Sequence, residues 1–202
     1  IVIDPGHGGK DPGAMAFGLK EKDIVLKISK KVAALLKEKS RYEVVLTRTR
    51  DVFLPLEERT AIANANKSDL FISIHTNAHS DRAKSGIETY FLNLATDAGA
   101  MRVAAFENAT STHNIGELQD ILTTLMKKSK IDESTRLARF VHTNLVTGLG
   151  QHYKPRDLGV KQAPFYVLLG AQMPAVLAEI SFITNPEEAK LLQNEAHLNK
   201  IA

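Results

Sequence analysis

The sequence contains no cysteine among its 202 residues. Disulfide bonds and thiolate metal ligands are therefore excluded, and any metal site must use histidine, aspartate or glutamate side chains. The absence of cysteine is also compatible with an oxidising compartment. The chain has no apolar run approaching the ~20 residues that a transmembrane helix needs. We therefore expect no membrane span.

The sequence also lacks any strong excess of charge. The formal net charge is +3 and the isoelectric point lies near 9.0, which mildly favours an anionic polymer surface. No basic block with interleaved aromatic residues is present, so we expect no nucleic-acid partner. No signal peptide precedes the first strand, and we expect an excised domain or mature fragment that acts as a monomer.

Short apolar runs alternate with amphipathic stretches along the chain. The predicted strands cover residues 1–3, 42–47, 70–75, 87–92, 165–169 and 175–180, and the segment 156–163 is predicted to be a loop. Helices are predicted over 20–39, over 55–64 with Pro55 in the first turn, after an N-cap at Asp132, and after a capping box that begins at Asn185. The buried face of the Asp132 helix is expected to contain Leu137, Phe140, Val141 and Leu145. This alternation predicts one α/β domain over residues 1–202, with a mainly parallel central sheet flanked by helices.

Polar side chains follow three of these strands where each strand ends. His7 follows the first strand, His75 the run 70–74, and Glu179 the run 175–178. In open α/β sheets, ligands bind at the carboxyl ends of the strands. Glu21 lies in the first turn of the first helix, close to the end of the first strand. Since a catalytic zinc has three protein ligands and an open position, His7, Glu21 and His75 are candidate metal ligands.

Each of these residues also has a structural interpretation. A histidine after a strand is commonly a loop residue, and the helix dipole favours an acid at Glu21. Glu179 is either a paired carboxylate at the sheet end or a general base for a water molecule. The glycine-rich turn at His7 lacks the features of a phosphate-binding loop, and no H-E-x-x-H helix is present. Six further residues are interpreted as structural or surface residues: His79, His113, His142, His152, His197 and Glu88.

Five segments, taken together, point to a known family. They are IVIDPGHGGKDPGA, LFISIHTNA, GIETYFL, LGVKQAPFYVL and PAVLAEISFITNPEEAKLL. In this order they resemble the zinc-dependent N-acetylmuramoyl-L-alanine amidases of the bacterial cell wall, across nearly the whole chain apart from residues 96–130. One difference is Ser181 before Phe182, where many relatives have glycine.

The resemblance implies a chemistry for the four candidate residues. Zinc would be held by His7, Glu21 and His75, and Glu179 would be the catalytic carboxylate. The substrate would be peptidoglycan, cleaved at the amide between the lactyl group of N-acetylmuramic acid and L-alanine. This implies a periplasmic or extracellular location and a role in cell-wall remodelling and daughter-cell separation.

Two other functions remain open from the sequence. A zinc carboxypeptidase acting on the stem peptide would need a cationic pocket, for which Arg48, Arg50 or Arg156 could serve. A peptidoglycan-binding module without turnover would keep the fold but lose Glu179 or a ligand, and all four residues are present.

Residues 96–130 form a long helical stretch between a strand and the Asp132 helix. A connection of only ~2–6 residues would suffice in such a domain. Both of its predicted helices could simply pack on the domain. The second carries an apolar stripe: Ile115, Leu118, Ile121, Leu122, Leu125 and Met126.

The stretch is also similar to the inserted helix of the division-associated branch of these amidases. There a helix occludes the site and its glutamate completes zinc coordination, until a partner with a LytM-type domain displaces it. Glu107 matches that glutamate best. The resemblance therefore predicts that residues 96–130 are a regulatory insert, that Glu107 blocks the metal, and that the enzyme is autoinhibited.

Overall fold

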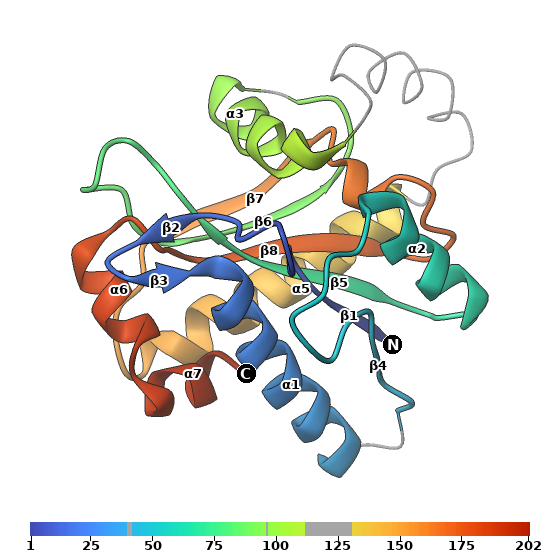
Figure 1. Ribbon diagram of the computed structural model, residues 1–202, viewed down its shortest axis with the longest axis horizontal. Coiled ribbons are helices and arrows are strands. Elements are labelled where there is room, and N and C mark those ends of the chain that lie inside the picture. The colour runs from blue at the N-terminus through green and yellow to red at the C-terminus, as the bar shows by residue number, and fades with distance from the viewer. Residues whose placement is uncertain (40–41, 96, 112–130) are drawn as a thin grey trace.

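A six-stranded sheet in the order β4-β1-β5-β8-β6-β7 organises the computed structural model, which describes residues 1–39, 42–95, 97–111 and 131–202 (Figure 1). The strands are β1 (Val2–Pro5), β4 (Val45–Leu46), β5 (Phe71–Asn77), β6 (Ile87–Leu92), β7 (Asp157–Ala163) and β8 (Ala175–Phe182). Strands β4, β1, β5 and β8 are parallel, whereas β6 runs antiparallel to β8 and parallel to β7. The prediction of one α/β domain with a mainly parallel sheet is confirmed.

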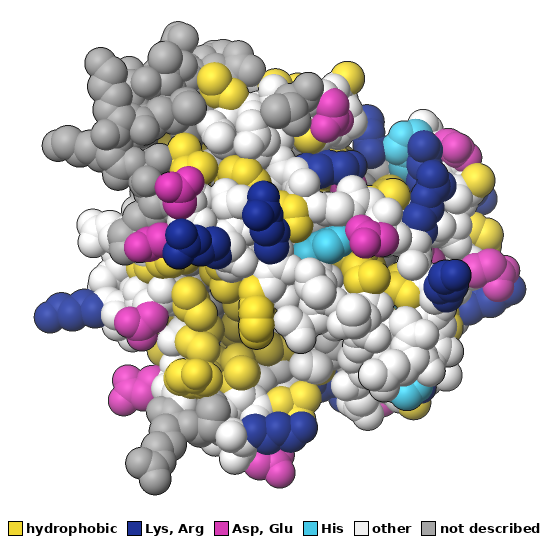
Figure 2. Space-filling view, turned by 180° about the vertical axis from the view of Figure 1, so that it is seen from behind, with side chains coloured by type: hydrophobic (Ala, Val, Ile, Leu, Met, Phe, Trp, Pro, Cys, Tyr) yellow, Lys and Arg dark blue, Asp and Glu magenta, His cyan; other side chains and the backbone are white. Residues whose placement is uncertain are grey.

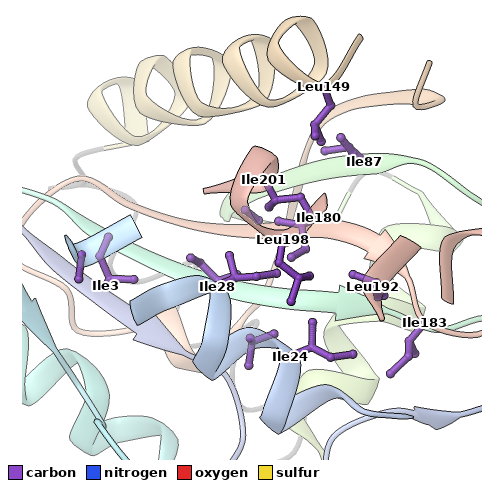
Figure 3. Close-up of a cluster of buried hydrophobic side chains, with 14 of the residues drawn as sticks. Ile3, Ile24, Ile28, Ile87, Leu149, Ile180, Ile183, Leu192, Leu198 and Ile201 are labelled. Atoms are coloured by element: carbon purple, nitrogen blue, oxygen red, sulfur yellow. The ribbon is translucent and has the colours of Figure 1, made fainter. Parts of the chain in front are cut away.

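One face of the sheet is covered by α1 (Glu21–Lys39), α5 (Ile131–Gly150) and α7 (Glu195–Ile201). Ile28 of α1, Ile180 of β8 and Ile201 of α7 meet in this layer (Figure 3). Burying each such side chain contributes about 1.5–3 kcal/mol. Asn185 caps α6 (Pro186–Leu192), which precedes α7, by accepting from the backbone amides of Glu187 and Glu188 at 3.0 Å each.

The other face is covered by α2 (Leu56–Ala65), α3 (Ala98–Glu107) and the 3-10 helix η3 (Tyr166–Leu168). Phe71 of β5, Tyr90 of β6 and Phe165 form the centre of this layer, and all three are fully buried. A second 3-10 turn, η1 (Asn108–Thr110), follows α3 directly. Because side chains alternate along a strand, His75 and Glu179 lie on this face together with Phe71 and Leu177.

An apolar groove of about 370 Å³ lies between α1 and α5, and Figure 2 shows the apolar side chains that gather around it. Phe140 of α5 lines this groove and is 69% exposed, so the prediction that it is buried was wrong. Leu137, Val141 and Leu145 on the same helix do pack on the core. Among the described residues, no helix combines the length and apolar content needed to cross a bilayer.

Several predicted elements differ from the structure. Residues 157–163 form strand β7 instead of a loop, because pairing with β6 stabilises a segment with a weak strand pattern. Residues 166–168 form η3 instead of a strand. Asp132 lies inside the first turn of α5 and is not its N-cap, and Pro55 is the N-cap of α2 and not a residue of its first turn. The short hairpin of β2 (Met15–Ala16) and β3 (Leu19–Lys20) was not predicted.

Candidate active site

The loop after β1 has an unusual backbone that tertiary contacts maintain. His7 has a φ of 56°, in the left-handed region that non-glycine residues rarely adopt. Arg59 donates to the carbonyl oxygens of Pro5 at 2.8 Å and His7 at 2.9 Å, and Arg48 donates to that of Gly6 at 2.7 Å. Strain of about 1–3 kcal/mol persists only where the surroundings impose it. The two buried arginines therefore fix the direction of the His7 side chain.

Two glycines allow the candidate ligands to approach one another. A Cβ atom on Gly6 would lie 2.5 Å from Cε1 of His75. A Cβ atom on Gly13 would lie 2.6 Å from both Oε2 of Glu21 and Cδ2 of His7. Since real Cβ contacts are never this short, any larger residue at either position must displace a candidate ligand.

Four side chains from separate elements converge at this end of the sheet: His7, Glu21, His75 and Glu107. One potential ligand atom from each lies within 4.8 Å of all the others. Nε2 of His7 is 3.2 Å from Oε2 of Glu21, and Nδ1 of His75 is 3.2 Å from Oε1 of Glu21. Oε2 of Glu107 lies 3.2 Å from the former nitrogen and 2.8 Å from the latter.

Hydrogen bonds hold His7, His75 and Glu21 in their orientations. Nδ1 of His7 lies 2.9 Å from Asp11, and Nε2 of His75 lies 3.1 Å from the hydroxyl of Ser73. The Glu21 carboxylate accepts from the backbone amides of Ala14 at 2.8 Å and Thr76 at 2.9 Å. Such partners fix the orientation of metal-binding side chains. Asp11 and Ser73 were not predicted, although Ser73 is two residues before His75 on the same strand face.

The inward atoms of the cluster have no hydrogen-bond partner among the described residues. Nε2 of His7, Nδ1 of His75 and Oε2 of Glu107 are buried, and their short contacts are not aligned as hydrogen bonds. An unsatisfied buried polar atom costs about 1–3 kcal/mol. Because these atoms face one another, a bound cation would satisfy them together. The cluster can therefore hold a metal ion, and imidazole and carboxylate ligands suit zinc.

The electrostatics of the cluster also fit a cation. Burial opposes the charged form of His75, but the Glu107 and Glu21 carboxylates raise its pKa to about 10. Burial likewise opposes a charge on His7, yet Glu21 and Glu107 raise its pKa well above the usual value. The pKa of Glu21 is lowered, because His7 and His75 outweigh the effect of burial. The carboxylates thus attract positive charge, which a divalent ion would supply.

Glu179 lies beside the cluster on β8. It is directly opposite His75 of β5 on one side and Glu88 of β6 on the other. It is fully buried, and within the part of the chain that the structure describes neither carboxylate oxygen has a hydrogen-bond partner. Burial, followed by the negative charge of Glu107, raises its pKa well above the ordinary value. A carboxyl group in this position can take part in proton transfer as an acid or a base.

Other polar residues near the sheet end have structural partners. Glu88 is buried, accepts from Asn77, and pairs with the ammonium of Lys161 at 2.6 Å. His142 is buried and lies 3.2 Å from the hydroxyl of Thr89 and 2.8 Å from Asp157. His113 lies outside the described residues. The prediction that Glu88 and His142 are structural agrees with these contacts, although the role of Lys161 was not predicted.

The fold and the site define a hydrolytic α/β domain whose buried cluster can hold a metal ion beside an unpaired carboxyl group. The family model for N-acetylmuramoyl-L-alanine amidase matches residues 1–202, and the chain belongs to this family of amidases.

Three individual proteins are similar to the chain over almost its whole length. The chain is 40% identical over 202 residues to the uncharacterized protein YqiI of Bacillus subtilis (strain 168), covering 100% of this chain and 79% of YqiI. It is 39% identical over 204 residues to the endolysin of Bacillus phage SPP1, covering 100% of this chain but 61% of the endolysin. The crystal structure of N-acetylmuramoyl-L-alanine amidase from Clostridium difficile 630 superposes with a TM-score of 0.76 at 31% identity, covering 99% of this chain and 88% of that one.

Proposed function

We propose that this chain is a zinc-dependent hydrolase that cleaves the amide between N-acetylmuramic acid and L-alanine in peptidoglycan. One observation carries the assignment of the metal: buried, unpaired atoms of His7 and His75 face each other across the Glu21 carboxylate. We assign these three residues as the zinc ligands, which is a ligand set of catalytic zinc sites. When bound, zinc would supply a Lewis acid for the scissile carbonyl and the attacking water.

Glu179 is assigned as the catalytic carboxylate. Among the described residues neither of its oxygens is engaged in a hydrogen bond, and its raised pKa suits proton transfer. Glu179 takes a proton from the water as it attacks the lactyl carbonyl and delivers it to the amine of L-alanine as the C–N bond breaks.

We further propose that the enzyme is autoinhibited and that residues 96–130 are its regulatory insert. A catalytic zinc keeps one position open for water, whereas Glu107 adds a fourth protein ligand to the cluster. Glu107 is the last residue of α3, and the face of α3 that it shares with Ala100, Val103 and Ala104 is buried against the domain. A carboxylate at this position would exclude the attacking water.

Polar contacts also hold α3 in place. Arg102 donates to the carbonyl of Ala78 at 2.9 Å. The side chain of Asn108 donates to the carbonyl of Pro164 and accepts from the amide of Tyr166, both at 2.8 Å. An activator must therefore bind the displaced state more tightly by the free energy of all these contacts.

We infer that the activator is a protein with a LytM-type domain, and that the enzyme acts in the periplasm or cell wall during daughter-cell separation. We propose the apolar stripe of the insert, Ile115 to Met126, as the landing surface of the activator, although this stripe lies outside the described residues. Its recognition as a helix in a groove remains a prediction.

Carboxypeptidase activity is less well supported. Arg48 is buried and donates four hydrogen bonds, to the carbonyls of Pro5, Gly6, Arg50 and Lys22, so at most one of its five N–H groups is left for a substrate carboxylate. Arg50 and Arg156 are exposed and lie on loops. Neither provides a buried cationic pocket.

Product analysis tests the proposed reaction. Purified peptidoglycan is incubated with the zinc-loaded Glu107→Ala variant, in which the site is expected to be open, and with the same variant treated with EDTA. The expected products are intact stem peptides with a free L-alanine amine, formed only with zinc. Release of single terminal amino acids would indicate a carboxypeptidase, and the absence of any product from the Glu107→Ala variant would indicate a binding module.

A further inference from the structure

A chain of hydrogen bonds through a buried arginine links the two histidines of the cluster. Arg59 of α2 is 1% exposed and donates to the carbonyl of His7 at 2.9 Å and to Oδ1 of Asp4 at 2.9 Å. The other carboxylate oxygen of Asp4 accepts from the hydroxyl of Ser73 at 2.7 Å. The oxygen of Ser73 then lies 3.1 Å from Nε2 of His75.

The tautomer of His75 follows from which groups in this series of hydrogen bonds carry a proton. Asp4 accepts from three donors, since the hydroxyl of Thr47 also bonds to Oδ1 at 2.5 Å. Burial alone would raise the pKa of Asp4, but Arg59 and the two hydroxyls lower it, so Asp4 is a carboxylate. A serine hydroxyl has one proton, and that of Ser73 is committed to Asp4. Towards His75, Ser73 can therefore only accept.

The bond to Ser73 at Nε2 determines the protonation of the other ring nitrogen of His75, Nδ1. If Nε2 of His75 carries the proton that Ser73 accepts, the neutral ring has its lone pair on Nδ1. Nδ1 is the atom that faces Glu21 at 3.2 Å and Glu107 at 2.8 Å. His7 is held in the reverse way, with Nδ1 bonded to Asp11 and Nε2 facing the cluster. The two rings thus need different partners to present a lone pair to one point.

We propose that Ser73 is a positioning residue of the metal centre: held by Asp4 and Arg59, it selects the His75 tautomer whose Nδ1 lone pair faces the metal. This inference rests on the metal centre proposed above. Arg59 helps to orient both histidines: it acts on His75 through Asp4 and Ser73, and it donates directly to the backbone carbonyl of His7. A helix that supplies no ligand, α2, thereby sets the relative placement of the two histidines.

A simpler interpretation is that Ser73 is only a satisfied polar residue of the core. Ser29 provides a matched control, since it is also fully buried but its hydroxyl has no partner among the described residues. It lies on α1 in the layer on the other face of the sheet. Replacing either serine with alanine removes the same atoms from the interior, and only Ser73 contacts a candidate ligand.

The experiment measures zinc affinity by chelator competition in the full chain, for wild type, Ser73→Ala and Ser29→Ala. Partners of metal-binding residues typically contribute about 10- to 100-fold in affinity. We expect Ser73→Ala to weaken zinc binding by about this factor and Ser29→Ala to leave it unchanged. Thermal unfolding in EDTA shows whether both variants fold.

A second measurement reads the tautomer directly. In the zinc-loaded wild type, nitrogen NMR of the imidazoles should show the His75 proton on Nε2. A proton on Nδ1, or wild-type affinity in a folded Ser73→Ala protein, would overturn the inference while leaving the metal centre intact. Absence of zinc binding by the wild type would instead overturn the proposed centre, and the role of Ser73 with it.

Discussion

Oε2 of Glu107 lies 2.8 Å from Nδ1 of His75. The last residue of α3 thus reaches the cluster formed by the loop after β1, the start of α1 and the end of β5. Because Glu107 belongs to a separately docked helix, it can be removed without removing the other candidate ligands. The proposed inhibition can therefore be tested with a single substitution at Glu107.

Replacing Glu107 with alanine should increase hydrolysis of peptidoglycan in the absence of any partner. The substitution opens the position that water needs, and zinc should be retained by His7, Glu21 and His75. Release of labelled fragments from purified peptidoglycan measures the rate, and metal analysis measures the zinc content.

Phe106→Ala is the matched control, because Phe106 neighbours Glu107 on α3 but is 45% exposed. Its rate should equal that of the wild type. Equal or lower activity of a folded Glu107→Ala protein would refute inhibition by Glu107 and leave α3 as a packing element.

Replacing Glu179 with glutamine should abolish turnover without loss of zinc. The amide has nearly the same shape but cannot accept the proton, and loss of a general base costs about 10²–10⁴ in rate. The rate is best compared in the Glu107→Ala background, where the site is expected to be open. Hydrolysis close to that of the parent protein would remove Glu179 from the mechanism.

Replacing His75 with alanine should abolish stoichiometric zinc binding. The fold should persist, since His75 lies near the end of β5 and its removal leaves the hydrophobic layers unchanged. Zinc content after gel filtration and the far-ultraviolet circular dichroism spectrum measure the two properties. Stoichiometric zinc in this variant would show that the ligand assignment is wrong.

Replacing Gly13 with alanine should weaken zinc binding, because the new methyl group would collide with His7 and Glu21. Gly18 is the matched control: its φ is +76°, compared with +64° at Gly13, and a Cβ there meets nothing within 4 Å. Both variants carry a backbone cost of about 1–2 kcal/mol. Only Gly13→Ala should lose zinc affinity in chelator competition, and equal affinities would contradict the role of this close approach.

Acid should destabilise the metal-free protein partly through Asp4. Burial alone would raise the pKa of Asp4, but Arg59 and two hydroxyls lower it below its ordinary value. A lowered pKa means that the stabilisation is fully present above the unfolded-state pKa and is lost as the pH falls through the folded-state value.

Urea unfolding of the metal-free protein across the acidic range measures this contribution. Near neutral pH, the free energy of unfolding of Asp4→Asn should be about 3–5 kcal/mol lower than that of the wild type, because the substitution leaves the Arg59 charge buried without its partner. Its free energy of unfolding should also vary less between about pH 5 and pH 2 than that of the wild type. An unchanged pH dependence would contradict the assignment of Asp4 as a buried carboxylate.

Local patterns in the sequence were enough for most of the fold. Strand β6 and the long helix α1 have nearly the predicted ends, because apolar periodicity depends on neighbouring residues. Strand β7 was missed, since its polar residues are stabilised by pairing with β6 and not by a local pattern. Phe140 was assigned to the core for a related reason: periodicity identifies a helix face but not whether another element covers it.

The sequence by itself determined that His7, His75 and Glu179 follow apolar runs and that Glu21 begins the adjacent helix. In the structure β5 continues to Asn77 and β8 to Phe182, so His75 and Glu179 lie inside their strands. Only the tertiary structure decided how these side chains are oriented. The His7 backbone conformation depends on Arg59, whose contacts with His7 and Asp4 join segments distant in the chain. Hydrogen bonds of this kind depend on the packing of α2 against the sheet, and local propensity contains no information about such long-range contacts.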